Sequence, residues 1–333
     1  MDLVTHLGLS ALSARSVKSR LPLRWSLGAA LLGAIFPDTD FLLLWVDPLS
    51  FHAYWHRSFT HSLLLLPLWS TLLAWFLYRV SRRRQPYVGL WGYTALGLAS
   101  HIAMDLLTSW RMPLLWPLDE WRLAMGWLFI IDLGFTGLLL LGLAASLRWN
   151  KALWLTWLGL ALWLGSAVYH KQQALQAGED FAADLDEPAQ VGAWPQPFSP
   201  LYWKLIVSTE EGHWQAYVHL GERLSPLTSL WPHRWLRQVA GLYAPVDDPD
   251  WHYNPRFAGP DDDGSLARQL WQSDTLKDLR YFARYPARYP VKENSECIWF
   301  AELLYALPEQ TPPFVYGSCR DEKGGWGRVH RRD

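Results

Sequence analysis

Hydrophobic residues are concentrated in the first half of the chain, in long runs separated by short polar segments. Each run approaches the roughly 20 apolar residues that an α-helix needs to cross a bilayer. The runs cover residues 26–46, 62–80, 87–107, 126–147 and 152–169. We therefore predict a mainly α protein with a multi-pass transmembrane helical bundle of about five spans. A shorter apolar helix in the first 14 residues is expected to cross only in part.

The pattern changes after residue 171, where long apolar runs give way to a Pro- and Trp-rich region with strand signals. The segment 203–220, WKLIVSTEEGHWQAYVHL, predicts a hairpin because two runs of β-forming residues flank a short turn containing EEG. We predict two domains: a transmembrane helical domain at 1–171 and a soluble α+β domain at 172–333.

Composition agrees with a membrane protein and excludes one class of partner. The chain has 333 residues, is 50% hydrophobic and is 18% charged, against roughly 25% charged residues in soluble domains. Its net charge of -1 offers no electrostatic attraction for nucleic acid. The expected partner is the lipid bilayer itself, and the oligomeric state stays open. The N-terminus lacks a basic segment and a cleavage site, so we expect it to be retained.

Basic residues predict how the helices are oriented. They cluster in alternate loops, as expected for the cytoplasmic loops of a multi-pass membrane protein. These loops contain Arg15, Lys18, Arg20 and Arg24, then Arg79 and Arg82 to Arg84, then Arg148 and Lys151. The C-terminal domain is then extracytoplasmic. Its two cysteines, Cys297 and Cys319, would lie in an oxidising compartment, although the sequence leaves open whether they pair.

Ionisable residues inside the apolar runs are the candidate functional groups. Each is costly in a bilayer unless it is paired, hydrated or bound to a metal. The candidate metal ligands are His6, Asp38, Asp40, His56, His61, His101, Asp105 and Asp132.

The depth of these groups supports a shared site. Counting about 16 to 18 residues from the basic end of each helix, at 1.5 Å per residue, places groups from four helices roughly 24 to 27 Å along their spans. His101 and Asp105 are four residues apart and therefore share a helical face. Pro37 is expected to break its span and redirect Asp38 and Asp40.

Mixed imidazole and carboxylate ligands favour one or two divalent ions, Zn²⁺ first, with Mn or Fe as alternatives. Hydroxide generated at such a metal would attack an ester or phosphoester. Either Asp40 or Asp105 would act as general base, and Arg57 would clamp the developing negative charge. A site at membrane depth suggests an amphiphilic substrate, such as a lipid or a lipid-linked phosphate.

Two other functions use the same residues. An ion-coupled transporter or proton pathway would also bury His and Asp side chains, but transporters commonly have repeated halves with matching broken helices. The sequence has one such break, at Pro37, and no repeat. A scaffold whose outer domain binds partners would need none of these side chains.

Several short motifs resemble one bacterial family. MDLVTH, PDTD, HRSFTHS, HIAMD followed by PLLWPL, and FIIDLGFT occur in order over residues 1–150. Together they resemble the membrane-bound metal-dependent hydrolases of the YdjM/YfhP type, also described as LexA-regulated. The resemblance implies a multi-pass inner membrane protein whose His and Asp residues hold a catalytic metal, at the eight positions named above. It supplies no substrate.

Overall fold

The computed structural model describes residues 1–18, 20–197, 200–221, 241–259, 262, 264–290, 297–320 and 325–330. The chain divides into two compact units. The first contains Met1–Tyr169 with Pro195–Pro200, and the second contains His170–Trp194 with Leu201–Asp333.

The first unit is helical. Five helices, together with the first part of α7, form most of its described residues, and α2 continues directly into a 3₁₀ segment, η1 (Phe36–Trp45). The helices are α1 (Leu3–Ser16), α2 (Leu23–Ile35), α4 (Leu66–Val80), α5 (Tyr87–Leu106), α6 (Leu133–Ser146) and α7 (Lys151–Ala183). A single turn, α3 (Pro48–Ser50), leads into a π-helical turn, η2 (Phe51–Trp55). The short N-terminal helix predicted from the sequence is α1.

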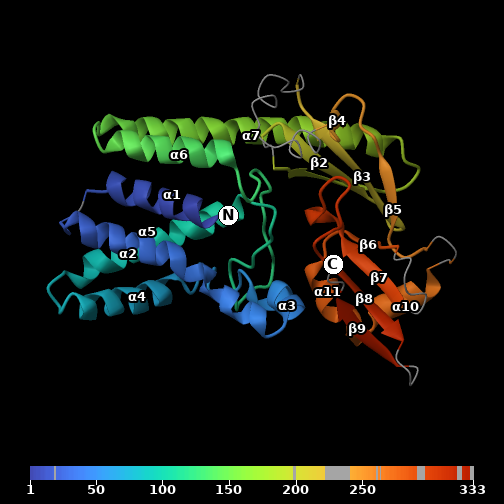
Figure 1. Ribbon diagram of the computed structural model, residues 1–333, viewed down its shortest axis with the longest axis horizontal. Helices are drawn as coiled ribbons and strands as arrows, with labels where there is room; N and C mark the ends of the chain where they lie inside the picture. Colours follow the sequence, from blue (N-terminus) through green and yellow to red (C-terminus); the bar gives the residue numbers. More distant parts are fainter. Residues whose placement is uncertain are drawn as a thin grey trace. The chain divides into compact units, whose positions relative to one another are not determined.

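Helices α2, α4 and α5 run side by side (Figure 1). Glycines allow α2 and α5 to approach closely. A Cβ added to Gly97 of α5 would lie 2.0 Å from the carbonyl oxygen of Ala30 in α2, and one added to Gly33 would lie 2.3 Å from the carbonyl oxygen of Thr94. Small residues permit such backbone contact between apolar helices. The close packing brings η1, which continues α2, next to the last turns of α5.

The predicted bundle of five spans is wrong. Within the part of the chain that the structure describes, two helices are long and apolar enough to cross a membrane. They are Leu23–Trp45, formed by α2 and η1, and Lys151–Ala183, which is α7.

Helix boundaries explain the difference. The apolar run at 62–80 becomes helical only at Leu66, and the run at 126–147 only at Leu133, so α4 and α6 have 15 and 14 residues. At 1.5 Å per residue these helices extend about 21 to 22 Å, short of the roughly 30 Å hydrocarbon core. Helix α5 has 20 residues, but polar residues such as Thr94, His101 and Asp105 interrupt its apolar sequence.

The second unit contains two sheets. The first is five-stranded, with order β1-β2-β3-β4 and with β5 also paired to β3. Its strands are β1 (Gln190–Pro195), β2 (Tyr202–Ser208), β3 (Gly212–His219), β4 (Ala244–Pro245) and β5 (His252–Pro255). Strands β2 and β3 pair antiparallel, from Tyr202 opposite His219 to Ser208 opposite His213, which confirms the predicted hairpin.

The second sheet is antiparallel, with order β6-β7-β8-β9. Its strands are β6 (Pro286–Arg288), β7 (Cys297–Glu302), β8 (Val315–Arg320) and β9 (Trp326–His330). Two short helices, α10 (Ser265–Gln272) and α11 (Lys277–Phe282), precede β6, together with the single 3₁₀ turn η3 (Asp274–Leu276) between them. Another 3₁₀ turn, η4 (Leu303–Tyr305), follows β7. The strands of this unit agree with the strand signals after residue 171.

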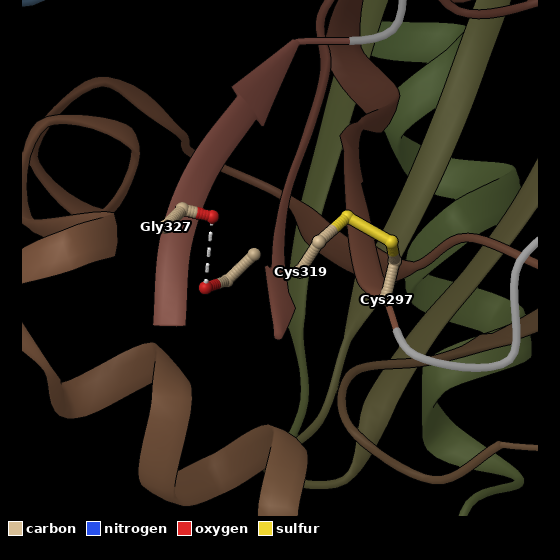
Figure 2. Close-up of a disulfide and its surroundings, with 4 residues drawn as sticks. Cys297, Cys319 and Gly327 are labelled. Carbon is tan, nitrogen blue, oxygen red and sulfur yellow. Dashed lines mark hydrogen bonds between the residues drawn. A yellow bond between two sulfur atoms is a disulfide. The ribbon is translucent and has the colours of Figure 1, made fainter. Parts of the chain in front are cut away.

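A disulfide joins the two central strands of this sheet. Cys297 of β7 and Cys319 of β8 are directly opposite each other in the strand register, with Cα atoms 4.0 Å apart. Figure 2 shows the bond, together with the hydrogen bond from the Ser318 hydroxyl to the carbonyl oxygen of Gly327 in β9. The pairing that the sequence left open is therefore formed.

Candidate metal centre

The two aspartates of PDTD point to different partners because they lie on a 3₁₀ segment. Pro37 is at the start of η1, and residues two apart on a helix of three residues per turn differ by about 120° in direction. Asp38 Oδ1 lies 3.5 Å from His101 Nε2. Asp40 Oδ2 lies 3.3 Å from His56 Nδ1. The break at Pro37 thus separates the two carboxylates.

Helix α5 supplies the centre of the site. His101 and Asp105 lie one turn apart in its last turns and are fully buried. Their side chains meet on one face, with Nε2 of His101 3.5 Å from Oδ2 of Asp105. Asp38 of η1 lies near His101, and His61 of the loop before α4 lies near Asp105.

The segment HRSFTHS lies in turns that precede α4. His56 follows the π-helical turn η2, and Arg57 has a left-handed backbone with φ of +56°. A non-glycine residue rarely adopts this conformation, so surrounding contacts must hold it there. His61 Nε2 lies 3.2 Å from Asp105 Oδ2 and 3.2 Å from His101 Nε2.

Four side chains bring their ligand atoms together. One atom from each lies within 4.8 Å of all the others. The group consists of Asp38, His61, His101 and Asp105. The last three are buried, whereas the side chain of Asp38 is 25% exposed. Two imidazoles and two carboxylates form a ligand set that suits Zn²⁺, Mn²⁺ or Fe²⁺.

Hydrogen bonds to the outer nitrogens orient both histidines. His101 Nδ1 lies 2.6 Å from the carbonyl oxygen of Ala34, so it donates there, and the lone pair of the neutral ring is on Nε2. Pro37 cannot supply the backbone donor three residues after Ala34, which leaves this carbonyl available. Thr60 Oγ1 donates to Asp40 Oδ2 at 3.4 Å and accepts from His61 Nδ1 at 2.9 Å.

The donor set therefore fits a cation. The Nε2 lone pairs of His61 and His101 face each other, and Asp105 Oδ2 beside them is buried without a hydrogen-bond donor in the described residues. Acceptors that converge without a proton repel one another unless a positive ion lies between them. Hydrogen bonds that fix the outer nitrogen are the usual arrangement of metal-binding histidines.

Arg57 connects the two aspartates nearest to it. Its backbone N–H donates to Asp40 Oδ2 at 2.9 Å, and its Nη2 donates to Asp105 Oδ1 at 2.8 Å. Nη1 donates to Thr108 Oγ1 at 3.0 Å, and the amino group of Met1 also contacts Asp105 Oδ1. These donors occupy one oxygen of Asp105 and leave Oδ2 directed at the imidazoles.

His6 and His56 flank the group. The His6 ring stacks on that of His101, with centroids 3.7 Å apart, and its Nε2 lies 3.2 Å from Asp105 Oδ1. His56 is beside Asp40, which lies 3.9 Å from Nδ1 of His61. Neither histidine belongs to the set of four, and Asp40 is likewise outside it.

The structure places Asp132 in a different role. Its carboxylate accepts the backbone N–H of Phe135 at 2.9 Å and caps the start of α6, and Nε1 of Trp163 donates to it at 3.3 Å. Sequence reasoning missed the groups that orient the ligands, among them the carbonyl of Ala34 and the hydroxyls of Thr60 and Thr108. Only a hydroxyl adjacent to a histidine, as in Thr60, gives a sequence signal for such a role.

Comparison with known proteins identifies a family that matches the first half of the chain. The family model described as YdjM inner membrane protein matches residues 1–174. The inner membrane protein YdjM of Escherichia coli (strain K12) is 40% identical over 102 residues, which cover 28% of this chain and 50% of that protein. The protein of the same name from Shigella flexneri matches with the same values. The chain spans about half the length of these curated relatives. No solved structure matches the chain.

Proposed function

The chain belongs to the YdjM inner membrane protein family, and on that premise we propose that it is a metal-dependent hydrolase of the bacterial inner membrane. The observation that carries the proposal is the convergence of His61 Nε2, His101 Nε2 and Asp105 Oδ2 on one point, with Asp38 beside them. The ion would be a single divalent cation held by these four residues, with Zn²⁺ favoured by the two imidazoles. When bound, such an ion acidifies water and polarises a substrate oxygen.

Asp40 is the better of the two candidates for general base. It lies outside the set of four ligands, is buried, and lies 3.3 Å from His56 Nδ1. Asp105 is inside the set, and one of its oxygens already accepts from Arg57. A carboxylate that binds no metal can take a proton from water, and His56 beside it can pass that proton on.

Arg57 has two roles in this proposal. Its Nη2 holds Asp105 in position, and its left-handed backbone directs the amide N–H at Asp40. Its buried Nε has no hydrogen-bond partner within the described residues. This donor is available to the anionic charge that develops when an ester or phosphoester is attacked.

The proposed substrate is an amphiphilic ester or phosphoester, such as a lipid or a lipid-linked phosphate. Two features support it: the family is described as an inner membrane protein, and Asp38 lies within a helix apolar and long enough to cross a membrane. A ligand at such a depth reaches the site most easily from the bilayer.

We also propose that the protein is multi-pass and that its second unit is extracytoplasmic. Arg148 and Lys151 at the start of α7 favour a cytoplasmic location for that end of the helix. The Cys297–Cys319 disulfide supports an oxidising environment for the other end.

The test is hydrolysis by purified protein in detergent, loaded with Zn²⁺ and given a bacterial lipid extract or water-soluble esters. We expect products from the lipid extract, detected by mass spectrometry and abolished by a chelator. Asp40→Asn should slow release at least about 100-fold, the usual contribution of a general base. His252→Ala is the control, because the side chain of His252 is 63% exposed and lies in the second unit. Cleavage of soluble esters alone would overturn the lipid substrate, and absence of all cleavage would overturn the hydrolase.

A further inference from the structure

A polar cavity in the second unit contains none of the candidate metal ligands, all of which belong to the first unit. Its volume is about 380 Å³, within the roughly 300 to 1,000 Å³ of ordinary ligand pockets. It lies where β1 begins, where β2 and β5 end and where the chain leads into β6. Two arginines from different segments line it, Arg256 after β5 and Arg284 before β6.

Neither arginine has a carboxylate partner within 4.0 Å in the part of the chain that the structure describes. Arg256 Nη2 donates to the carbonyl oxygen of Thr209 at 3.1 Å. Its Nε is buried and has no acceptor among the described residues. A buried N–H without an acceptor costs about 1 to 3 kcal/mol, so this donor favours a ligand that accepts from it.

Arg284 is held in place by two aromatic rings and by a side-chain hydrogen bond to Tyr285. Its guanidinium lies 4.4 Å from the ring centroid of Trp194 and 5.4 Å from that of Tyr285. Stacking engages the flat face of the guanidinium, so the N–H groups that Tyr285 does not use remain directed outward in the plane.

Tyr285 adds a neutral donor to the same cavity. Its hydroxyl oxygen accepts from Trp194 Nε1 at 3.3 Å and from Arg284, and its O–H group can donate to a ligand in the cavity. Two guanidinium groups and one hydroxyl, from two segments of the chain, therefore line one small polar space.

The negative charges nearby leave the cavity positive. Glu211 is paired with Arg268 at 2.6 Å. Glu302 is buried and accepts backbone N–H groups of Arg284, Tyr285 and Leu304. Glu210 is the acidic residue in the lining of the cavity. Two guanidinium groups thus face one exposed carboxylate.

Ser208, which lines the cavity, and His213 form a closed pair. His213 Nε2 donates to the carbonyl oxygen of Pro286 at 3.0 Å, so its Nδ1 accepts the Ser208 hydroxyl at 2.7 Å. Burial, with Arg256 as a second cause, lowers the pKa of His213 to about 4. The positive charge of Arg256 opposes an imidazolium here, which argues against a nucleophile and base and in favour of a binding site.

We propose that this cavity binds a phosphate group, carried either by a soluble phosphomonoester or by a lipid headgroup. Arginine forks match phosphate oxygens, and the tetrahedral anion offers acceptors to donors that arrive from separate segments. The site goes beyond the proposed hydrolase, because none of its residues belongs to the metal centre.

Calorimetric titration of the full chain in neutral detergent tests this proposal. The probes are inorganic phosphate, glycerol 3-phosphate, water-soluble dihexanoyl phosphatidylglycerol, and acetate. We expect one phosphate-bearing ligand per chain and no comparable binding of acetate. Tighter binding of the phosphatidylglycerol identifies a lipid headgroup as the source, whereas tighter binding of glycerol 3-phosphate identifies a soluble phosphomonoester.

Four variants complete the test. Arg256→Gln and Arg284→Gln should each weaken phosphate binding at least about tenfold, the effect of losing a charge-assisted hydrogen bond. Glu210→Gln should strengthen it, because a repelling charge is removed. Arg320→Gln, on β8 and outside the cavity, should leave it unchanged. Circular dichroism and metal content should match the wild type in all four variants. Absence of binding by any phosphate probe, or equal binding by Arg256→Gln, would overturn the proposal, as would equally strong binding of acetate.

Discussion

The Nε2 atoms of His61 and His101 lie 3.2 Å apart, and the outer nitrogen of each ring is hydrogen-bonded to an oxygen of the protein. The two lone pairs therefore face each other in a buried space that Asp105 also enters. An arrangement of this kind is unfavourable for the protein alone and favourable for a cation between the rings. Metal affinity therefore depends on the groups that orient the two rings and on the packing of α2 against α5.

Removing the hydroxyl of Thr60 should weaken metal binding without removing a ligand. Thr60→Val leaves His61 Nδ1 without its partner, and loss of such outer contacts typically costs 10- to 100-fold in affinity. Competition with a chromogenic chelator measures the change. Thr39→Val is the matched control, since within the described residues Thr39 Oγ1 bonds locally, to the carbonyl oxygen of Phe36. Equal affinity in both variants would show that Thr60 does not orient the ligand.

Gly97 should tolerate no side chain, because α2 touches the backbone there. In Gly97→Ala the new Cβ would lie 2.0 Å from the carbonyl oxygen of Ala30, so α2 must move away. We expect a loss of about 1 to 3 kcal/mol of stability and weaker metal binding, because Asp38 moves with α2. Gly92→Ala on the same helix meets nothing within 4 Å and should raise the melting temperature slightly. Similar melting temperatures for the two variants would contradict this packing.

The disulfide should stabilise the second unit and be present in protein taken from cells. Maleimide should label neither cysteine of the unreduced wild type, whereas Cys297→Ser should expose Cys319 to labelling. The variant should lose about 2 to 4 kcal/mol of stability in the transition of this unit. Dithiothreitol should shift the wild type in the same way. Full labelling of native wild type would argue against an oxidising location.

Buried Lys204 should make stability depend on pH. Burial lowers the pKa of Lys204 to about 7, although Glu302 acts in the opposite direction. Because its pKa in the unfolded chain is 10.5, the unfolded state binds more protons between pH 7 and pH 10, and stability must rise with pH in that range. Lys204→Met should flatten the rise of stability between pH 7 and pH 9. The measurement is the melting temperature of the second unit, whose unfolding transition is the one that Cys297→Ser lowers. An unchanged slope would mean that Lys204 keeps its ordinary pKa.

The hairpin at 202–219 could be predicted from the sequence because its strands and its turn are defined by nearby residues. The number of membrane spans could not be predicted from the sequence in this way. Hydrophobic runs show which residues avoid water, but local contacts decide where a helix begins. Asp132 caps α6 and starts it at Leu133, and the turns around His61 delay α4 until Leu66.

The candidate ligands could be named from the sequence, but the sequence could not show which of them share one site. All eight share one property, a polar side chain near an apolar run, and Asp132 has it as clearly as Asp105. Tertiary contacts decide which of these residues come together. Glycines let α2 pack closely against α5, and this packing places Asp38 beside His101. The left-handed backbone of Arg57 turns the chain so that His61 reaches Asp105.

Metal content is the most direct test of the central claim. Elemental analysis of detergent-purified protein should find about one equivalent of a divalent transition metal in the wild type and in His252→Ala. His61→Ala and His101→Ala should each lose it while keeping the helical circular dichroism signal. A wild type that binds no metal even after reconstitution with Zn²⁺, or a His101→Ala variant that binds as much as the wild type, would contradict the account. Ion flux into liposomes by such metal-free protein would indicate a carrier in place of an enzyme.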